Sequence, residues 1–390
     1  MTITIIIIIC VLLLLAYLFD ISSPLTKIPS VILLLLLGWF VKQITEIFQL
    51  HTPDLNPLLP IFGTIGLILI VLEGSLELEL NRSKFSVVKK SLLNALLPMF
   101  ALAFLFAFAF QYFGQISYKM ALVNAIPFCV ISSAIAIPSV RNLSPFNKEF
   151  IIYESSLSDI FGVLFFNFIA LNEIINGQSF GNFALQLLLI TAISFIAVLG
   201  LSFLLSRIKH HITFTPIILM VILIYSVSKV YHLPGLIFIL VFGLFLGNLD
   251  ELKRFRWIEK FRPEKLDKEV KKFKEITMEA TFLIRALFFL LFGFLMEAKE
   301  ILNPETIPWA SAIVLSIILV RWLALKLSKL SISPLLFVAP RGLITILLFL
   351  AILPEQTIPI VNKSLIIQTI ILSVLVMMFG LMTIKKNETH

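Results

Sequence analysis

The stretch ITIIIIICVLLLLAYLF, from Ile3 to Phe19, decides the fold class of this chain. It contains no charged residue and approaches the roughly 20 apolar residues that an α-helix needs to cross about 30 Å of hydrocarbon. No Lys or Arg precedes it, whereas a secretory signal peptide begins with a basic segment. We therefore expect this segment to remain in the protein as a membrane-spanning helix.

The same composition extends over the whole chain. Of its 390 residues, 59% are hydrophobic and 14% are charged, whereas soluble proteins average about 45–50% apolar and about 25% charged residues. This excess argues against a water-soluble enzyme, and no polar segment is long enough for a soluble domain. The sequence predicts an all-α polytopic membrane protein.

Hydropathy divides the chain into thirteen predicted spans. They cover residues 3–19, 28–48, 57–79, 91–113, 119–140, 149–173, 181–206, 212–229, 233–249, 275–297, 307–327, 332–353 and 364–384. The weakest division lies between the eighth and ninth spans, where only residues 230–232 interrupt the apolar sequence.

The positive charges predict how the spans are oriented. Most of the 31 Lys and Arg fall on one side of the membrane if the N-terminus lies outside, and residues 250–275 hold many of them. The opposite loops hold Lys42, Lys119, Lys229, Lys299 and Lys363. Cytoplasmic loops are enriched in Lys and Arg, so we expect the N-terminus outside, the C-terminus inside and a basic cytoplasmic loop at 250–275. The net charge of +8 then reflects topology, and no nucleic-acid partner is expected.

Two predicted spans contain helix-breaking residues. Pro127 and Pro138 flank Ser132 and Ser133 in the fifth span, and Pro340 interrupts the twelfth. A proline removes a backbone hydrogen bond, and the freed groups need a partner inside a bilayer. Each of these spans is the second of a triplet, so an inverted repeat would pair them, as at the binding sites of many transporters. The two serines could belong to such a binding site. The alternative is a purely structural role, since serine hydroxyls often bond to the preceding helical turn.

Asp159 stands out among the charged residues inside the spans. A charge at the bilayer centre costs from about 2.5 to more than 10 kcal/mol, depending on the method. Ser155 precedes Asp159 by one turn on the same helical face, and Ser158 lies beside it. Because carboxylate and hydroxyl oxygens are the ligands of hard cations, we predict that Asp159 exchanges a proton for a cation. The alternative is a structural hydrogen bond between helices.

Other buried charges require partners. Arg341 stays protonated, and we predict a structural ion pair with Glu154; the alternative is that Arg341 reaches the membrane interface. Glu73 is expected either to join the site or to lie near the membrane edge with Glu77 and Glu79.

We expect three further charged residues to have structural roles. Arg285 is expected to pair with Glu279 or Glu73, and Arg321 and Glu279 are expected at the membrane interface. The two cysteines, Cys10 and Cys129, lie in apolar runs and indicate neither a disulfide framework nor a metal site.

Several motifs resemble those of one transporter family. Glu154-Ser155-Ser156-Leu157-Ser158-Asp159 is similar to the E-S-x-x-N-D motif of monovalent cation/proton antiporters. Further similar segments, spread over nearly the whole chain, are residues 72–78, 132–143, 232–235, 243–248, 282–289 and 339–343.

The resemblance implies a fold in two parts. Residues 91–173 (helices 4–6) and 307–384 (helices 11–13) would form a moving core with two crossed, broken helices. Residues 1–80 and 181–297 would form the scaffold and the interface of a homodimer. Asp159 would be the shared cation and proton site. The residues implied around it are Ser132, Ser133, Ser155, Ser158 and Glu73, with Glu154 and Arg341 as the structural ion pair of the electroneutral branch and Arg285 as support.

We therefore expect an antiporter that exchanges one Na⁺, K⁺ or Li⁺ for one proton, without a cofactor, by elevator-type alternating access in a bacterial inner membrane. Ser133 and Ser158 stand where relatives carry an acid and an asparagine, which leaves the choice of cation open. Two alternatives are a passive cation channel or permease and a transport-inactive sensor derived from an antiporter. An intramembrane protease needs two facing aspartates or an H-E-x-x-H pair, so no enzymatic activity is expected.

Overall fold

The computed structural model describes residues 2–26, 28–49, 53–78, 84–207, 214–231, 233–249 and 263–383. Within these ranges the chain forms helices and loops and no β-strand. Ten of the described helical segments are long and apolar enough to cross a membrane. The chain is therefore an all-α, multi-pass membrane protein, as the sequence predicts.

The helices follow the predicted spans closely. Those before the middle of the chain are α1 (Thr2–Thr26), α2 (Ser30–Ile47), α3 (Leu58–Glu77), α4 (Phe85–Gly114), α5 (Tyr118–Ala125), η1 (Ile126–Phe128), α6 (Ser133–Ser139) and α7 (Pro145–Leu171). The remainder are α8 (Gly177–Arg207), α9 (Phe214–Val230), α10 (Leu236–Gly247), α12 (Pro263–Leu295), α13 (Ala298–Ile301), α14 (Ile307–Leu327), α15 (Leu343–Leu350), η3 (Pro354–Gln356) and α16 (Lys363–Met382).

Two predicted segments are corrected. The twelfth span, expected over 332–353, is helical only in α15, because the residues up to the Pro340 break form turns and extended backbone. The loop expected at 250–275 is helical from Pro263 onward, since proline is well suited to the first turn of a helix. Residues 250–262 of that loop, His232 and the ends of the predicted segments 1–80 and 307–384 lie outside the described residues.

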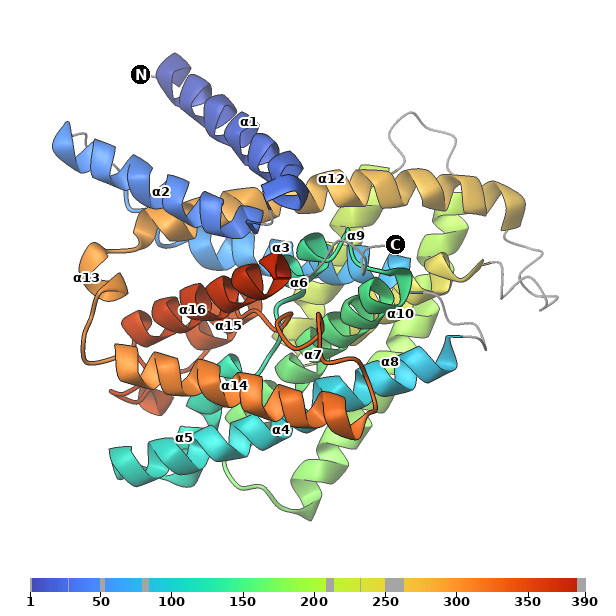
Figure 1. The fold of residues 1–390 in the computed structure, drawn as a ribbon. Helices are drawn as coiled ribbons and strands as arrows, with labels where there is room; N and C mark the ends of the chain where they lie inside the picture. The colour runs from blue at the N-terminus through green and yellow to red at the C-terminus, as the bar shows by residue number, and fades with distance from the viewer. Residues whose placement is uncertain are drawn as a thin grey trace.

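The helices pack in two groups. In one, α12 packs along α2 and α3, and α3 packs against α10. In the other, α4 packs against α5, α7 and α14, and α14 packs against α16. Figure 1 shows α1, α2 and α12 on one side of the molecule and α4, α5 and α14 on the other, with α6, α7 and α15 between them.

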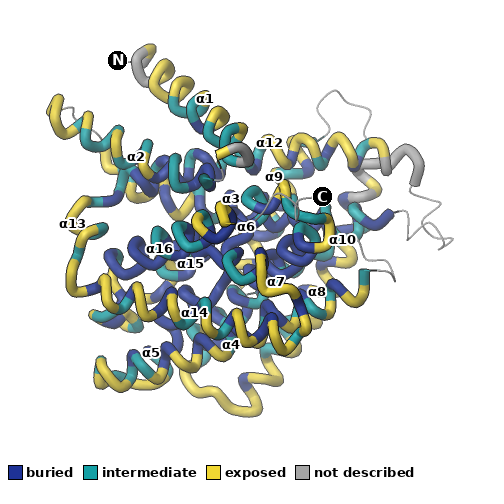
Figure 2. The backbone as a smooth tube through the Cα atoms, in the orientation of Figure 1, coloured by how far each residue is buried: buried dark blue, intermediate teal, exposed yellow. Residues whose placement is uncertain are grey.

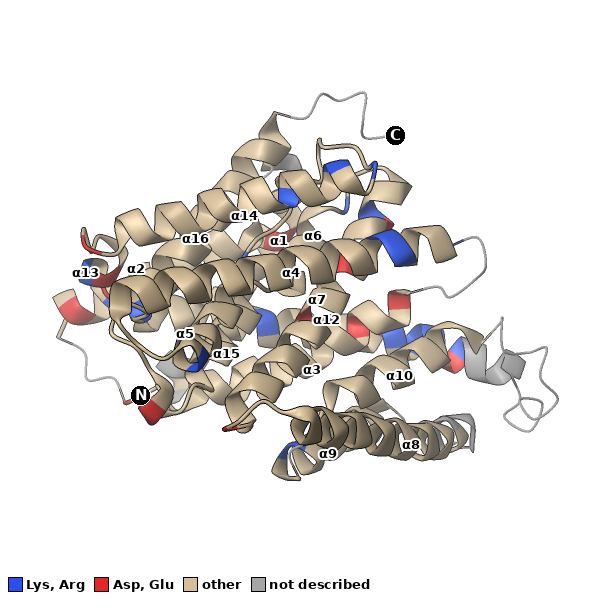
Figure 3. Ribbon diagram, turned by 90° about the horizontal axis from the view of Figure 1, so that it is seen from below, with Lys and Arg blue, Asp and Glu red and all other residues tan. Residues whose placement is uncertain are grey.

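Burial is highest where the two groups meet. In the most apolar stretch of the broken segment Tyr118–Ser139, 89% of the residues are buried, whereas in that of α1 only 6% are buried. Exposed residues therefore follow the outer helices in Figure 2, and many are Leu, Ile and Phe. Charged residues gather mainly near helix ends and loops in Figure 3. Apolar outer faces with charged ends fit a bilayer, which leaves the interrupted helices in a protein-lined interior.

Glycines allow the close approach of α2 and α12. A Cβ added to Gly38 would overlap the backbone of Leu290 and Phe294, and one added to Gly293 would overlap the backbone of Leu35. Small residues let membrane helices approach closely, and dispersion contacts then hold the helices together.

We expect Gly293→Val to lower the melting temperature of the protein in detergent. Overpacking costs about 1–3 kcal/mol where neighbouring side chains can move, and here the valine would meet backbone atoms, which move less easily. Gly200→Val is the matched control, since nothing lies within 4 Å of a Cβ at Gly200. Equal melting temperatures for the two variants would contradict this packing.

Candidate cation-binding site

The two interrupted segments meet, and a backbone hydrogen bond joins them. The fifth span stops being helical after η1 and resumes at Ser133 in α6. The backbone N–H of Ser132 donates to the carbonyl of Pro340 at 2.9 Å, and the N–H of Ile131 donates to Ser158 Oγ at 2.9 Å. Two of the N–H groups at the first break thus bond to the second broken segment and to α7, as an apolar environment requires.

Asp159 lies beside this crossing on α7 and is 2% exposed. Its Oδ2 accepts a hydrogen bond from the hydroxyl of Ser133, and the Ser133 backbone N–H also donates to the carboxylate. Its Oδ1 is buried and has no hydrogen-bond partner within the described residues. One oxygen is therefore held in place while the other remains available to a ligand.

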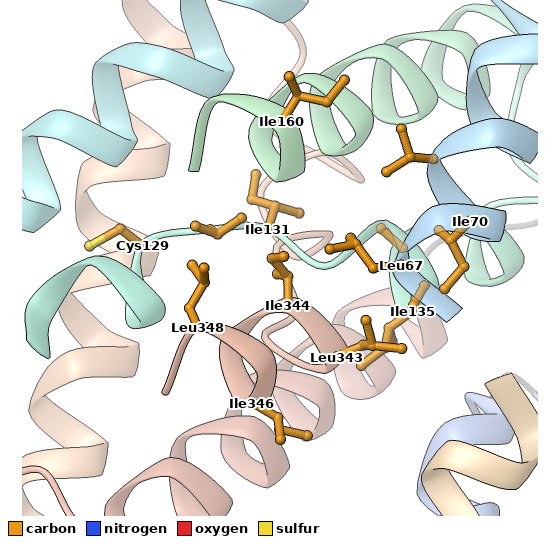
Figure 4. Close-up of a cluster of buried hydrophobic side chains, with 14 of the residues drawn as sticks. Leu67, Ile70, Cys129, Ile131, Ile135, Ile160, Leu343, Ile344, Ile346 and Leu348 are labelled. Carbon is orange, nitrogen blue, oxygen red and sulfur yellow. The ribbon is translucent and has the colours of Figure 1, made fainter. Parts of the chain in front are cut away.

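Apolar side chains surround the crossing. Figure 4 shows Ile131 and Ile135 from the fifth segment, Ile160 from α7 and Leu343 and Ile344 from α15 in one cluster. All five are buried. In such an environment the ionised carboxylate of Asp159 is stable only with a positive partner.

The other predicted serines have different positions. Ser158 Oγ accepts from Ile131, and Ser155 Oγ donates to the carbonyl of Ile151 at 2.7 Å, which leaves its lone pairs free. Ser132 Oγ is buried without a partner in the described chain. Ser156 Oγ is also buried and unpartnered, and a Cβ on Gly74 of α3 would lie 2.8 Å from it. Ser156 was missed because helical spacing favoured Ser155.

Glu154 pairs with Arg321, and the predicted pair with Arg341 is wrong. Arg321 donates from Nη1 and Nη2 to the two carboxylate oxygens of Glu154, both at 2.8 Å. Arg321 is only 3% exposed, so its side chain lies inside the protein. Arg321 Nε donates to the carbonyl of Leu335 at 2.7 Å, which explains why this arginine turns inward from α14.

Arg341 is stabilised by backbone carbonyls. Its Nε donates to Phe128 at 2.6 Å, and its guanidinium nitrogens donate to Ala339 at 2.8 Å and to Cys129 at 3.4 Å. Phe128 and Cys129 end η1, where carbonyls lack partners and carry partial negative charge. Arg341 therefore links the two broken segments and does not reach a membrane interface.

Glu73 and Arg285 belong to a second charged cluster. Arg285 Nη2 lies 3.6 Å from Asp20 Oδ1, and Glu73 of α3 is within electrostatic range of Arg285. Arg141 Nη1 also pairs with Asp20, at 3.1 Å from Oδ2. The structure therefore groups Glu73 with these residues, and its described interactions do not include Asp159. Asp20 directly follows the first apolar stretch, where it resembles an ordinary flanking charge, so no signal in the sequence pointed to its two arginine partners.

A cavity of about 170 Å³ lies next to the turn of α7 that carries Asp159. Its lining includes Thr64 and Leu67 of α3, Asn167 of α7, Tyr225 of α9 and Ile160, the neighbour of Asp159. It lies toward the start of α3 and the end of α7.

Comparisons with known proteins agree with this architecture. The model of the family described as "Sodium/hydrogen exchanger, transmembrane" matches residues 10–385. The chain is similar to the sodium proton antiporter MjNhaP1 from Methanocaldococcus jannaschii at pH 8, with a TM-score of 0.66, 20% identity and coverage of 98% of this chain and 96% of that chain. An electron-microscopy structure of the same antiporter gives a TM-score of 0.64, 21% identity and coverage of 98% and 95%. No curated protein matches the chain.

We expect Arg321→Met to lower stability by about 3–5 kcal/mol, because it leaves Glu154 charged and buried without a partner. The double variant Glu154→Gln/Arg321→Met should lose less than the sum of the single variants. Melting temperatures in detergent, compared in a double-mutant cycle, measure this coupling. Glu154→Gln with Arg341→Met is the matched control. Stronger coupling in the control would contradict the assigned pair.

Proposed function

The chain belongs to the sodium/hydrogen exchanger family, and we propose that it exchanges one monovalent cation for one proton at Asp159. The main support for this proposal is the hydrogen bonding of the two Asp159 carboxylate oxygens. Ser133 holds Oδ2, Oδ1 is buried without a partner in the described residues, and the cavity ends beside this turn of α7.

Competition at one carboxylate provides the coupling. A bare carboxylate in the buried crossing is costly, whereas a proton or a cation neutralises it. The part of the protein that carries Asp159 therefore moves readily only when one of the two is bound. Each passage in one direction carries a cation and each return carries a proton, which is alternating access with obligatory exchange.

The surrounding oxygens suit a small dehydrated cation. Oδ1 of Asp159 and the hydroxyls of Ser132 and Ser155 supply oxygen ligands of the type that hard cations prefer. None of these serines adds a charge, so the cation is held by one negative group. Na⁺, K⁺ and Li⁺ remain candidates, because Ser133 and Ser158 replace the acid and the asparagine of the similar motifs.

Electroneutral exchange is supported by the other buried charges near the crossing, because each of them already has a partner within the protein. Glu154 is neutralised by both terminal nitrogens of Arg321, and Arg341 is held by backbone carbonyls. Asp159 is then the carboxyl at the crossing that exchanges its partner. One cation against one proton moves no net charge across the membrane.

The helix packing supports an elevator-type motion. We propose that the group containing α4, α6, α7, α14 and α16 moves as a core against the group containing α2, α3, α10 and α12. The second group would be the scaffold, and its outer helices would form a homodimer in a bacterial inner membrane. The same site in a passive channel would conduct without coupling, and a transport-inactive sensor would bind the cation without moving it.

We expect Asp159→Asn to abolish cation-driven proton flux in proteoliposomes, because an amide cannot exchange a proton for a cation. A pH-sensitive dye, with separate pulses of Na⁺, K⁺ and Li⁺, measures the flux and the preferred ion.

Ser133→Ala should raise the apparent KM for the cation by roughly tenfold, since a hydrogen bond to a charged group contributes about 1.5–3 kcal/mol. Ser194→Ala is the matched control, because its buried hydroxyl bonds within α8. Full flux in Asp159→Asn would overturn the assignment.

The exchange rate of the wild-type protein should not change when a membrane potential is imposed with valinomycin and a potassium gradient, with sodium as the transported ion. A rate that rises or falls with the potential would show net charge movement and would refute the one-for-one stoichiometry. A sustained sodium current without dye response would indicate the passive channel.

A further inference from the structure

Asp20 joins parts of the chain that the proposed function sets in relative motion. Its Oδ2 accepts from Arg141 Nη1 at 3.1 Å, and its Oδ1 faces Arg285 Nη2 at 3.6 Å. The hydroxyl of Ser30 on α2 also donates to Oδ1, at 3.4 Å. The Asp20 side chain is 15% exposed, so both oxygens act in a largely dehydrated setting.

The partners of Asp20 come from both helix groups. Ser30 and Arg285 lie on α2 and α12, which pack together. Arg141 follows α6, which packs against α7, and it connects these two helices. The ion pair between Asp20 and Arg141 therefore ties the proposed core to the proposed scaffold.

This ion pair lies at the end opposite the cavity. The cavity is lined by the first half of α3 and the second half of α7. Arg141 precedes the start of α7, and Glu73, near the end of α3, is within electrostatic range of Arg285 and Arg141. Between the cavity and the ion pair, Ser156 and Ile137 of the core group pack against Gly74 of α3. Among the described residues, the cavity thus lies on one side of this packing contact and the Asp20 ion pair on the other.

The charge arrangement makes the contact reversible. Arg141 is 44% exposed, whereas Arg285 is 7% exposed. When Arg141 moves away, it becomes hydrated and Asp20 keeps Arg285 as a partner, so no buried charge is left alone. An ion pair with an exposed member is weak, which suits a contact that opens and closes in every cycle.

We propose that Asp20 is a positioning residue of the transport cycle, which holds Arg141 and so keeps the core closed against the scaffold at the end opposite the cavity. The inference rests on the proposed function, because it assumes that the two helix groups move. Loss of the pair should shift the equilibrium toward the state that opens at the Asp20 end, by roughly two- to fivefold.

Cysteine labelling tests this shift without requiring transport. Ile137→Cys, in a background of Cys10→Ser and Cys129→Ala, places a reporter at the closed contact with Gly74. Arg141→Gln should raise its rate of modification by a membrane-impermeant maleimide roughly two- to fivefold, and Arg141→Lys should restore the original rate. Lys272→Gln is the matched control, because its exposed ion pair with Glu269 lies within α12. Equal labelling in Arg141→Gln and the parent protein would overturn the proposal.

Sided transport assays separate positioning from a purely structural role. In Arg141→Gln and Asp20→Asn, the apparent KM for the cation should rise at the cavity side and fall at the Asp20 side. A structural defect would instead lower the maximal rate equally from both sides, and that result would count against the proposal. Absence of exchange in the wild-type protein would refute the antiporter function alone, since the labelling result would still decide whether Asp20 holds this end closed.

Discussion

A charge in an apolar interior must be neutralised, and this constraint organises the structure around the crossing. Glu154 meets it with both terminal nitrogens of Arg321, and Arg341 meets it with the carbonyls at the end of η1. Asp159 has hydrogen bonds from Ser133 on one oxygen and no partner on the other within the described residues. Glu154 and Arg341 are therefore neutralised by the protein itself. The Asp159 carboxylate still requires a proton or a cation.

The broken helices and the charged residues depend on each other. Interrupted backbone exposes polar groups that a bilayer cannot satisfy, and here Ser132 bonds to Pro340 while Arg341 caps the carbonyls of the other segment. The same crossing places Ser133 against Asp159. Packing around the crossing joins α6, α7 and α15, so Asp159 is placed where several helices meet.

Sequence reasoning placed the spans well but assigned some partners wrongly. Apolar runs and prolines act locally, so α3, α4 and the break after η1 were predictable from neighbouring residues. The partner of Glu154 was not, because Arg321 and Arg341 are both arginines in the last third of the chain and only the packing of α14 against the core decides between them. Asp20 was overlooked for the same reason: at the end of its apolar run it resembles an ordinary flanking charge, yet Arg141 and Arg285 converge on it.

The sequence by itself determined that this protein is an all-α membrane protein with Asp159 as an isolated acid near two helix breaks, because hydropathy, proline and charge express themselves over a few adjacent residues. Only the tertiary structure decided which arginine neutralises Glu154, that Glu73 lies with Arg285, and that the cavity and the Asp20 cluster lie at opposite ends of the site. These features depend on distances between helices remote in the chain, and such distances are set by how side chains of several helices pack together.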